Sequence, residues 1–67
     1  MKKATKHKCP CCGKLTLEQI GNYEICSICG WEDDPTQRKD KDFEGGANEL
    51  SLNQARKAWK EKTQAKA

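Results

Sequence analysis

The 67-residue sequence has few large apolar side chains, few aromatic residues and no long hydrophobic run. Residues of the hydrophobic class make up 34% of the chain, and its aromatic residues are two Trp, one Tyr and one Phe. A chain this short buries too little apolar surface to offset the ordering of its backbone, which costs about 1–2 kcal/mol per residue. We therefore expect one domain at most, stabilised by a cross-link.

Other absences narrow the range of functions. No stretch approaches the roughly 20 apolar residues of a membrane span, so we expect no membrane association. The N-terminal lysines are not followed by the apolar run of a secretory signal, which favours a cytoplasmic location with reduced thiols. His7 is the one histidine, so neither a Ser/His/Asp nor a Cys/His catalytic set can be assembled. The sequence predicts a protein that is not an enzyme.

What the chain does have is five cysteines, four of them in two C-x-x-C-G motifs. The two residues between the cysteines let the chain turn so that both sulfurs face one ion, and the following glycine allows the positive φ of such a turn. Four thiolates suit a closed, structural Zn²⁺ site, and metal binding would supply on the order of 10 kcal/mol. The predicted ligands are Cys9, Cys12, Cys26 and Cys29.

Iron is the main alternative cofactor, because two C-x-x-C-G motifs also hold the single iron of rubredoxins. Residues 29–35 are similar to the first rubredoxin motif, but here they follow the second cysteine pair. Four aromatic residues are also few for the shell that tunes such a site. A disulfide framework is disfavoured by the odd number of cysteines. We expect Zn²⁺, with iron and electron transfer as an alternative.

Two further residues lie close to the first cysteine motif. Cys11 is not needed for four-coordination, and it is either an exposed non-ligand cysteine or a redox-sensing thiol whose thiolate Lys8 or Lys14 would stabilise. His7, two residues before Cys9, could replace a ligand, although a histidine in a tail is more often solvated.

The segment between the two cysteine pairs is expected to form a β-hairpin. The β-prone runs 15–17 and 23–25 are separated by Gly21-Asn22, which suits a tight reversal. Residues 1–8 alternate lysine with small polar residues, so we expect a disordered basic tail. A single domain over 9–67 would follow this tail.

The second half of the domain is expected to be an acidic loop followed by a helix. Residues 32–49 are rich in turn formers, and Phe43 is their one large apolar anchor. Ser51 and Gln54 have the form of a capping box, which predicts a helix over 52–64. The fold class is thus a small metal-bound α+β protein, a zinc ribbon plus one C-terminal helix. The apolar stripe expected to dock on the ribbon comprises Leu52, Ala55 and Trp59.

Charge is distributed unevenly along the chain. Residues 1–14 carry five lysines and no acid, whereas residues 32–49 carry seven acids against three bases. Four thiolates and one Zn²⁺ would lower the formal net charge from +3 to about +1, which weakens a prediction of nucleic-acid binding from charge alone. The acidic run 32–34 is either a solvated face or a binding site for a basic partner.

In combination, the motifs resemble those of the bacterial cysteine-rich CPCC family over roughly residues 9–59. The resemblance implies a small, mostly stand-alone protein with an expected zinc site and no settled biochemical activity. Gly30 stands where members often carry an aromatic residue. The segment after the second pair typically reads Trp-Glu-Asp-Asp in this family, which favours a binding role for Trp31, Glu32, Asp33 and Asp34. The same acidic motif could equally cap or orient the ribbon by hydrogen bonding to backbone N–H groups. The resemblance rests on residues 9–13, 15–17, 23–26, 29, 31–34, 45–48, 50–52 and 55–56.

The sequence therefore favours a non-enzymatic protein-interaction or regulatory module that presents its acidic loop to another protein. Nucleic-acid binding through the lysine-rich tail and the basic face of the helix is the second hypothesis. A rubredoxin-like electron carrier is the third. A monomer is favoured, although the sequence does not fix the oligomeric state.

Overall fold

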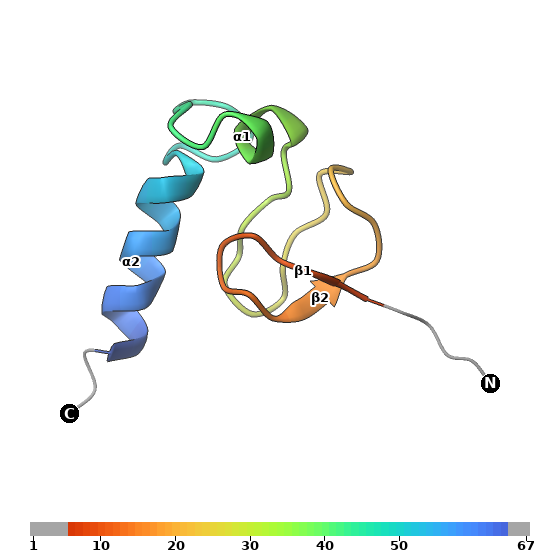
Figure 1. Cartoon of the computed structure of the whole chain (residues 1–67), viewed down its shortest axis with the longest axis horizontal. Helices are drawn as coiled ribbons and strands as arrows, with labels where there is room; N and C mark the ends of the chain where they lie inside the picture. Colours follow the sequence, from red (N-terminus) through yellow and green to blue (C-terminus); the bar gives the residue numbers. More distant parts are fainter. Residues whose placement is uncertain (1–5, 65–67) are drawn as a thin grey trace.

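The computed structural model describes residues 6–64, and its chain runs through two short strands and two helices (Figure 1). The molecule is flat, with principal extents of 38 × 33 × 14 Å. The cysteine-bearing unit (6–31) and the long helix lie on opposite sides, and the acidic segment (32–50) joins them (Figure 1). Within 6–64, no helix combines the length and apolar character needed to cross a membrane. The elements are β1 (His7–Lys8), β2 (Leu15–Leu17), α1 (Pro35–Lys39) and α2 (Leu52–Gln64).

The β-hairpin encloses the first cysteine pair instead of separating the two pairs. β1 runs antiparallel to β2, with His7 opposite Leu17. The backbone N–H of Cys9 donates to the carbonyl of Lys14 at 2.9 Å, which closes the hairpin around the first cysteine turn. The disordered tail predicted over 1–8 is therefore wrong at its last two residues, which form β1, and its first five lie outside the described residues.

The second strand predicted at 23–25 is not formed. Ile25 makes an isolated antiparallel bridge with Glu32, and three backbone hydrogen bonds join residues 23–26 to residues 31–33 without forming a regular ladder. The carboxylate of Glu24 accepts a hydrogen bond from the backbone N–H of Glu18 at 2.8 Å. The backbone N–H of Glu18 is thus bonded to a side chain, and it is not free to donate to the carbonyl of a neighbouring strand.

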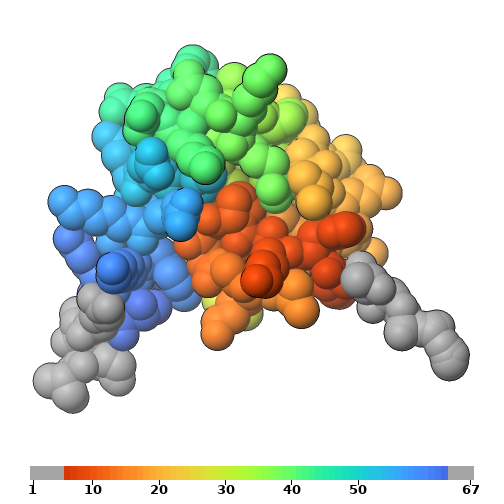
Figure 2. Space-filling view, in the orientation of Figure 1, coloured from red at the N-terminus to blue at the C-terminus, as the bar shows by residue number. Residues whose placement is uncertain are grey.

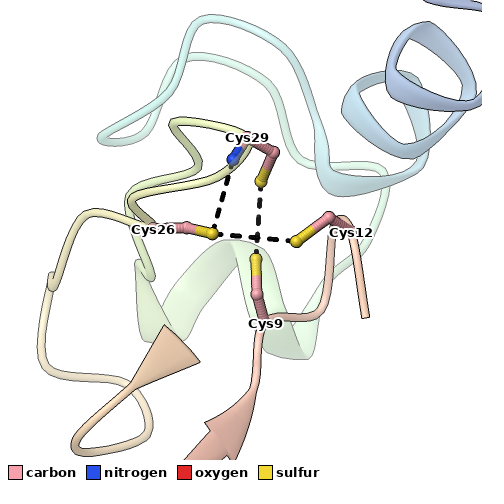
Figure 3. Close-up of side chains that lie close together, drawn as sticks. All are labelled: Cys9, Cys12, Cys26 and Cys29. Carbon is pink, nitrogen blue, oxygen red and sulfur yellow. Dashed lines mark hydrogen bonds between the residues drawn. The ribbon is translucent and has the colours of Figure 1, made fainter. Parts of the chain in front are cut away.

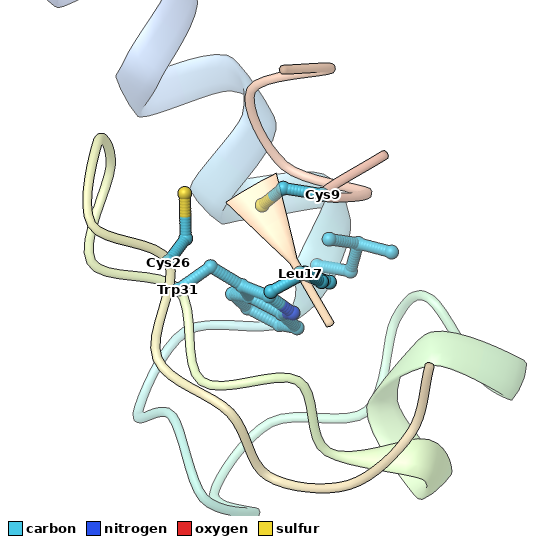
Figure 4. Close-up of a cluster of buried hydrophobic side chains, with 5 residues drawn as sticks. Cys9, Leu17, Cys26 and Trp31 are labelled. Carbon is cyan, nitrogen blue, oxygen red and sulfur yellow. The ribbon is translucent and has the colours of Figure 1, made fainter. Parts of the chain in front are cut away.

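The apolar core is small and includes two metal-site cysteines. Leu17 comes from β2 and Leu52 from the first turn of α2, and the indole of Trp31 lies beside Leu17 in the same cluster (Figure 4). The indole nitrogen of Trp31 is buried without a hydrogen-bond partner among residues 6–64. With so few apolar groups buried, the core depends on the cysteine cluster for its order. The buried apolar residues are Cys9, Leu17, Cys26, Trp31 and Leu52.

The acidic segment has a polar anchor. Gln37, on α1, is fully buried, and its side-chain amide donates to the carbonyls of Phe43, Asn48 and Leu50 at 3.0, 3.1 and 3.0 Å. Phe43 itself is 40% exposed. The prediction that Phe43 anchors this loop is wrong, because one buried amide satisfies several loop carbonyls that would otherwise lack partners.

Both helices begin at capped residues. Asp34 is the N-cap of α1, a helix that the sequence prediction missed, and Pro35 occupies the first turn. The predicted capping box of α2 is confirmed: the N–H of Ser51 donates to Oε1 of Gln54 at 2.9 Å, and the N–H of Gln54 donates to Oγ of Ser51 at 3.1 Å. The predicted helix over 52–64 is confirmed with the same bounds.

Gly46 permits the closest approach within the acidic segment. A Cβ atom at this position would lie 2.5 Å from Oδ2 of Asp34 and 2.9 Å from Cδ of Gln37. Both distances are shorter than van der Waals contact. Only glycine therefore lets the loop after α1 lie against these two buried side chains.

Candidate metal centre

The four predicted ligand cysteines converge at the centre of the cysteine-bearing unit (Figure 3). Their four sulfurs lie within 4.8 Å of one another. The sulfurs of Cys9 and Cys29 are 3.6 Å apart, and those of Cys12 and Cys26 are 3.7 Å apart. A tetrahedral ion with metal–sulfur bonds of about 2.3 Å holds its sulfurs about 3.8 Å apart. The arrangement therefore fits a single four-coordinate metal ion.

The two cysteine turns have the same backbone geometry. In the first, the N–H of Gly13 donates to the carbonyl of Cys9 at 2.8 Å, and Gly13 has a φ of +81°. In the second, the N–H of Gly30 donates to the carbonyl of Cys26 at 2.9 Å, and Gly30 has a φ of +85°. The predicted positive φ values are confirmed. A Cβ at either glycine would meet no atom within 4 Å, so the backbone conformation and not crowding favours glycine.

Cys26 is the sulfur with the most donors directed at it. The hydroxyl of Thr16, on β2, donates to Sγ of Cys26 at 3.1 Å, and the N–H groups of Ile28 and Cys29 donate at 3.3 and 3.5 Å. Burial alone would raise the pKa of this thiol, but the hydrogen bonds outweigh it and lower the pKa to about 6. These donors stabilise the thiolate that a metal requires.

Two other ligands hold their protons more tightly. Burial raises the pKa of the Cys9 thiol far above its ordinary value, and burial raises that of Cys29 to about 12. A bound cation would release these protons, because a thiol that coordinates a metal is deprotonated. The site can therefore take up a dication in exchange for protons.

Cys11 and His7 lie outside the four-sulfur cluster. His7 is exposed on β1 and is not part of the four-cysteine cluster found among residues 6–64. Cys11 is half-buried, where the sequence predicted an exposed cysteine, and burial raises the pKa of its thiol.

Asp33 is used inside the fold. It is fully buried, and its Oδ2 accepts the backbone N–H of Gly21 at 2.6 Å. The guanidinium of Arg38 donates to both of its oxygens at 3.1 Å. This carboxylate joins the turn before the second cysteine pair to α1, a link that charge patterning did not reveal.

Asp34 is also committed to internal hydrogen bonds. Its Oδ1 accepts the N–H of Thr36 at 2.7 Å, and its Oδ2 accepts the N–H of Ala47 at 2.9 Å. The hydrogen bond from Ala47 is the main cause that lowers the pKa of Asp34 below its ordinary value, against the opposing effect of burial. The side chain both caps α1 and ties down the loop that follows it.

The predicted binding set Trp31, Glu32, Asp33 and Asp34 does not form an exposed acidic surface. Trp31, Asp33 and Asp34 are buried, at 3%, 0% and 5% exposure, and Glu32 is partly buried. The backbone of Glu32 is paired with the side-chain amide of Asn48 through two hydrogen bonds of 2.8 and 3.0 Å. The prediction that this motif is exposed for binding is wrong, and the alternative, hydrogen bonding to backbone N–H groups, is confirmed for Asp33 and Asp34. Arg38, which is partly buried, also pairs with Asp33.

A groove of roughly 370 Å³ lies between α2 and the second cysteine turn, and we refer to it as the α2 groove. Trp59 is half-buried in its wall, and the ammonium of Lys62 lies 5.7 Å from the centroid of the Trp59 ring. Figure 2 shows α2 lying against the cysteine-bearing unit along this side. The lining residues used below are Cys11, Cys29, Trp31, Ala55, Trp59 and Lys62.

Comparison with known families gives one match that spans almost the whole chain. The sequence model described as cysteine-rich CPCC matches residues 7–65. The match covers both cysteine motifs, the acidic segment and α2, and it confirms the resemblance identified from these motifs. A comparison with curated proteins gives no match.

Proposed function

The chain belongs to the cysteine-rich CPCC family, and we propose that it is a non-catalytic zinc-binding protein whose metal site stabilises a scaffold for binding another protein. The convergence of four thiols within 4.8 Å carries this proposal. Four protein ligands leave no position for a reacting water, so the ion would be structural. We regard the two cysteine turns with their hairpin as a zinc ribbon.

Zinc is favoured over iron by the surroundings of the cluster. Redox sites depend on hydrogen bonds and burial around the sulfurs. Here Cys26 receives three hydrogen bonds, which a redox site would also use. However, Tyr23 and Phe43 are exposed at 53% and 40%, so Trp31 is the one fully buried aromatic residue of the described chain. A single buried aromatic residue is little for the shell that tunes an iron site. We expect native mass spectrometry of the purified protein to find one Zn²⁺ per chain. A coloured protein with a reversible redox wave would instead support the iron carrier.

The surface proposed for partner binding is α2 with its groove. Arg56, Lys57 and Lys60 are exposed on this helix, and Lys62 lies at the groove beside Trp59. Lys62 is the one cation that lines the groove, and the other three extend the positive charge along the exposed part of the same helix. A cationic helix face with an apolar groove complements an acidic protein segment that carries an apolar side chain. We therefore propose a partner of that chemistry, in place of the basic partner that an exposed acidic loop would have attracted.

Charge reversal on α2 tests this surface. We expect Lys57→Glu with Lys60→Glu to remove partners retained by the immobilised zinc-loaded protein, and an acidic peptide from an identified partner to compete with binding. The matched control reverses the same number of charges at Lys39 and Lys41, which are exposed but lie outside α2. Equal loss of binding in both double variants, or in neither, would contradict the proposal.

Nucleic-acid binding is a second candidate, supported by the same exposed cations. Trp59 is half-buried, and the ammonium of Lys62 lies over its ring, which leaves less of the indole face for stacking a base. The net charge of about +1 expected for the zinc-bound chain weakens this candidate. Titration with single- and double-stranded oligonucleotides at physiological salt distinguishes the two. If no binding is detected up to about 100 μM, the affinity is weaker than that of ordinary non-specific binding, and nucleic-acid binding is excluded.

A further inference from the structure

The fifth cysteine lies beside one edge of the candidate metal site. Cys11 and Cys29 both line the α2 groove. Cys9 and Cys26 are 1% and 2% exposed, whereas Cys11 and Cys29 are only partly buried. The site therefore has a closed side and an open side, and the additional thiol is on the open side.

Geometry favours Cys29 as the partner of Cys11. Cys12 directly follows Cys11 in the chain, and consecutive Cα atoms are about 3.8 Å apart, closer than the roughly 4.4–6.8 Å of ordinary disulfides. Cys9 and Cys26 are covered by the core. Of the four ligands, Cys29 is the one that shares the groove with Cys11.

The groove also favours one class of oxidant. Its volume of roughly 370 Å³ is that of a small-molecule site, and Lys62 supplies a cation at its wall. A small anionic disulfide such as oxidised glutathione is attracted by this charge and can reach both thiols. Lys60, two residues earlier on α2, is exposed but does not line the groove.

We propose that Cys11 and Cys29 form a redox-sensitive thiol pair that a small anionic disulfide oxidises through the α2 groove. The sulfur of Cys11 attacks one sulfur of the reagent, forms a mixed disulfide and releases one reagent thiol, which takes the Cys11 proton. The thiolate of Cys29 then attacks the Cys11 sulfur, forms the Cys11–Cys29 disulfide and releases the second reagent thiolate. Two protein sulfurs are oxidised and one reagent disulfide is reduced. Cys29 is thereby removed from the ligand set.

This inference rests on the proposed zinc site, and its test uses the full zinc-loaded chain. Oxidised glutathione is added, released Zn²⁺ is followed with a chromogenic chelator, and disulfides are mapped by tandem mass spectrometry after alkylation. We expect metal release together with a Cys11–Cys29 disulfide. Cys11→Ser should bind Zn²⁺ as tightly as the unchanged chain but release it about tenfold more slowly. Equal release rates, or a map dominated by other pairs, would overturn the inference.

A second variant tests the route through the groove without altering a cysteine. Lys62→Glu should slow oxidation by oxidised glutathione several-fold and leave oxidation by the neutral 2-hydroxyethyl disulfide unchanged. Lys60→Glu makes the same charge change outside the groove and should have a smaller effect. Equal slowing by both variants would contradict entry through the groove. The metal content measured before the oxidant is added reports on the zinc site alone. A chain without zinc at that point would contradict the proposed zinc site, whereas a zinc-loaded chain that forms no Cys11–Cys29 disulfide would contradict only the thiol pair.

Discussion

The cysteine-bearing unit (6–31) and the acidic segment (32–50) are ordered by different means. In the first, four sulfurs within 4.8 Å of one another form the centre, and the surrounding chain has few regular hydrogen bonds. In the second, buried polar side chains bond to the backbone: Gln37 reaches three carbonyls, and Asp34 accepts two N–H groups. Neither region has an apolar core of ordinary size.

The difference shows how a chain with little apolar surface can specify one structure. A metal ion supplies a large stabilisation at one point, whereas a polar network supplies many small contributions whose geometry is demanding. The two regions meet at Asp33, which accepts the N–H of Gly21 and pairs with Arg38. We therefore expect damage to the first region to remove the whole fold and damage to the second to be graded.

Removal of the metal should have the largest effect. Because zinc binding contributes on the order of 10 kcal/mol in small metal-dependent domains, the chelated chain should be unfolded. Circular dichroism before and after a strong chelator measures this, and Cys26→Ser should behave like the chelated protein. If the amides of the acidic segment stayed protected from hydrogen exchange without metal, that segment would be ordered independently of the cysteine cluster, against this expectation.

Loss of the Gln37 amide should have the next largest effect. Gln37→Ala leaves three carbonyls without their donor and opens a cavity, so we expect about 3–5 kcal/mol of destabilisation in urea unfolding of the zinc-loaded chain. Gln37→Met keeps most of the volume and should isolate the hydrogen-bond part. If Met were tolerated as well as Gln, the polar anchor would be unnecessary and packing alone would order the segment.

The two regions also differed in how far the sequence predicted them. Ligand spacing and the glycines after each pair predicted the cysteine cluster, since both follow from local chain geometry. The helix over 52–64 was predicted because its capping box is local too. The hairpin partner, by contrast, was misassigned, since the β propensity of the run at 23–25 does not say which segment it pairs with, and its backbone hydrogen bonds go to residues 31–33.

The polar network was missed because its contacts join residues distant in the sequence. Gln37 bonds to carbonyls 6, 11 and 13 positions away, and no spacing rule predicts which amide becomes buried. For the acidic run the sequence left two alternatives open, an exposed binding surface and hydrogen bonding to backbone N–H groups. Asp33 and Asp34 lie inside, where backbone N–H groups and Arg38 satisfy them. From the sequence alone, carboxylates are expected at the surface, and the tertiary structure decides which of them are buried with hydrogen-bond partners.

A single methyl group tests the close packing of the acidic segment. Gly46→Ala would place a Cβ 2.5 Å from Asp34 and 2.9 Å from Gln37, so we expect about 2–3 kcal/mol of destabilisation from overpacking. Gly45→Ala is the matched control, since Gly45 has a φ of +80° but open space around it. We expect about 1 kcal/mol there from backbone strain alone. Equal urea midpoints for the two variants would show that the clash is relieved by a shift of the loop.

The smallest effect is expected at Asp34, where charge can be separated from shape. Asp34→Asn keeps an acceptor for the N–H of Thr36 but directs a donor at the N–H of Ala47, which should cost about 1–2 kcal/mol. Because the pKa of Asp34 is lowered in the folded state, its stabilisation is present above its ordinary pKa and is lost as pH falls through the lower folded value. The difference between variant and unchanged chain should therefore be constant from about pH 6 to pH 8 in urea unfolding. A difference that shrank within this range would mean that Asp34 titrates near neutrality, and the polar network would then be weaker than its hydrogen bonds indicate.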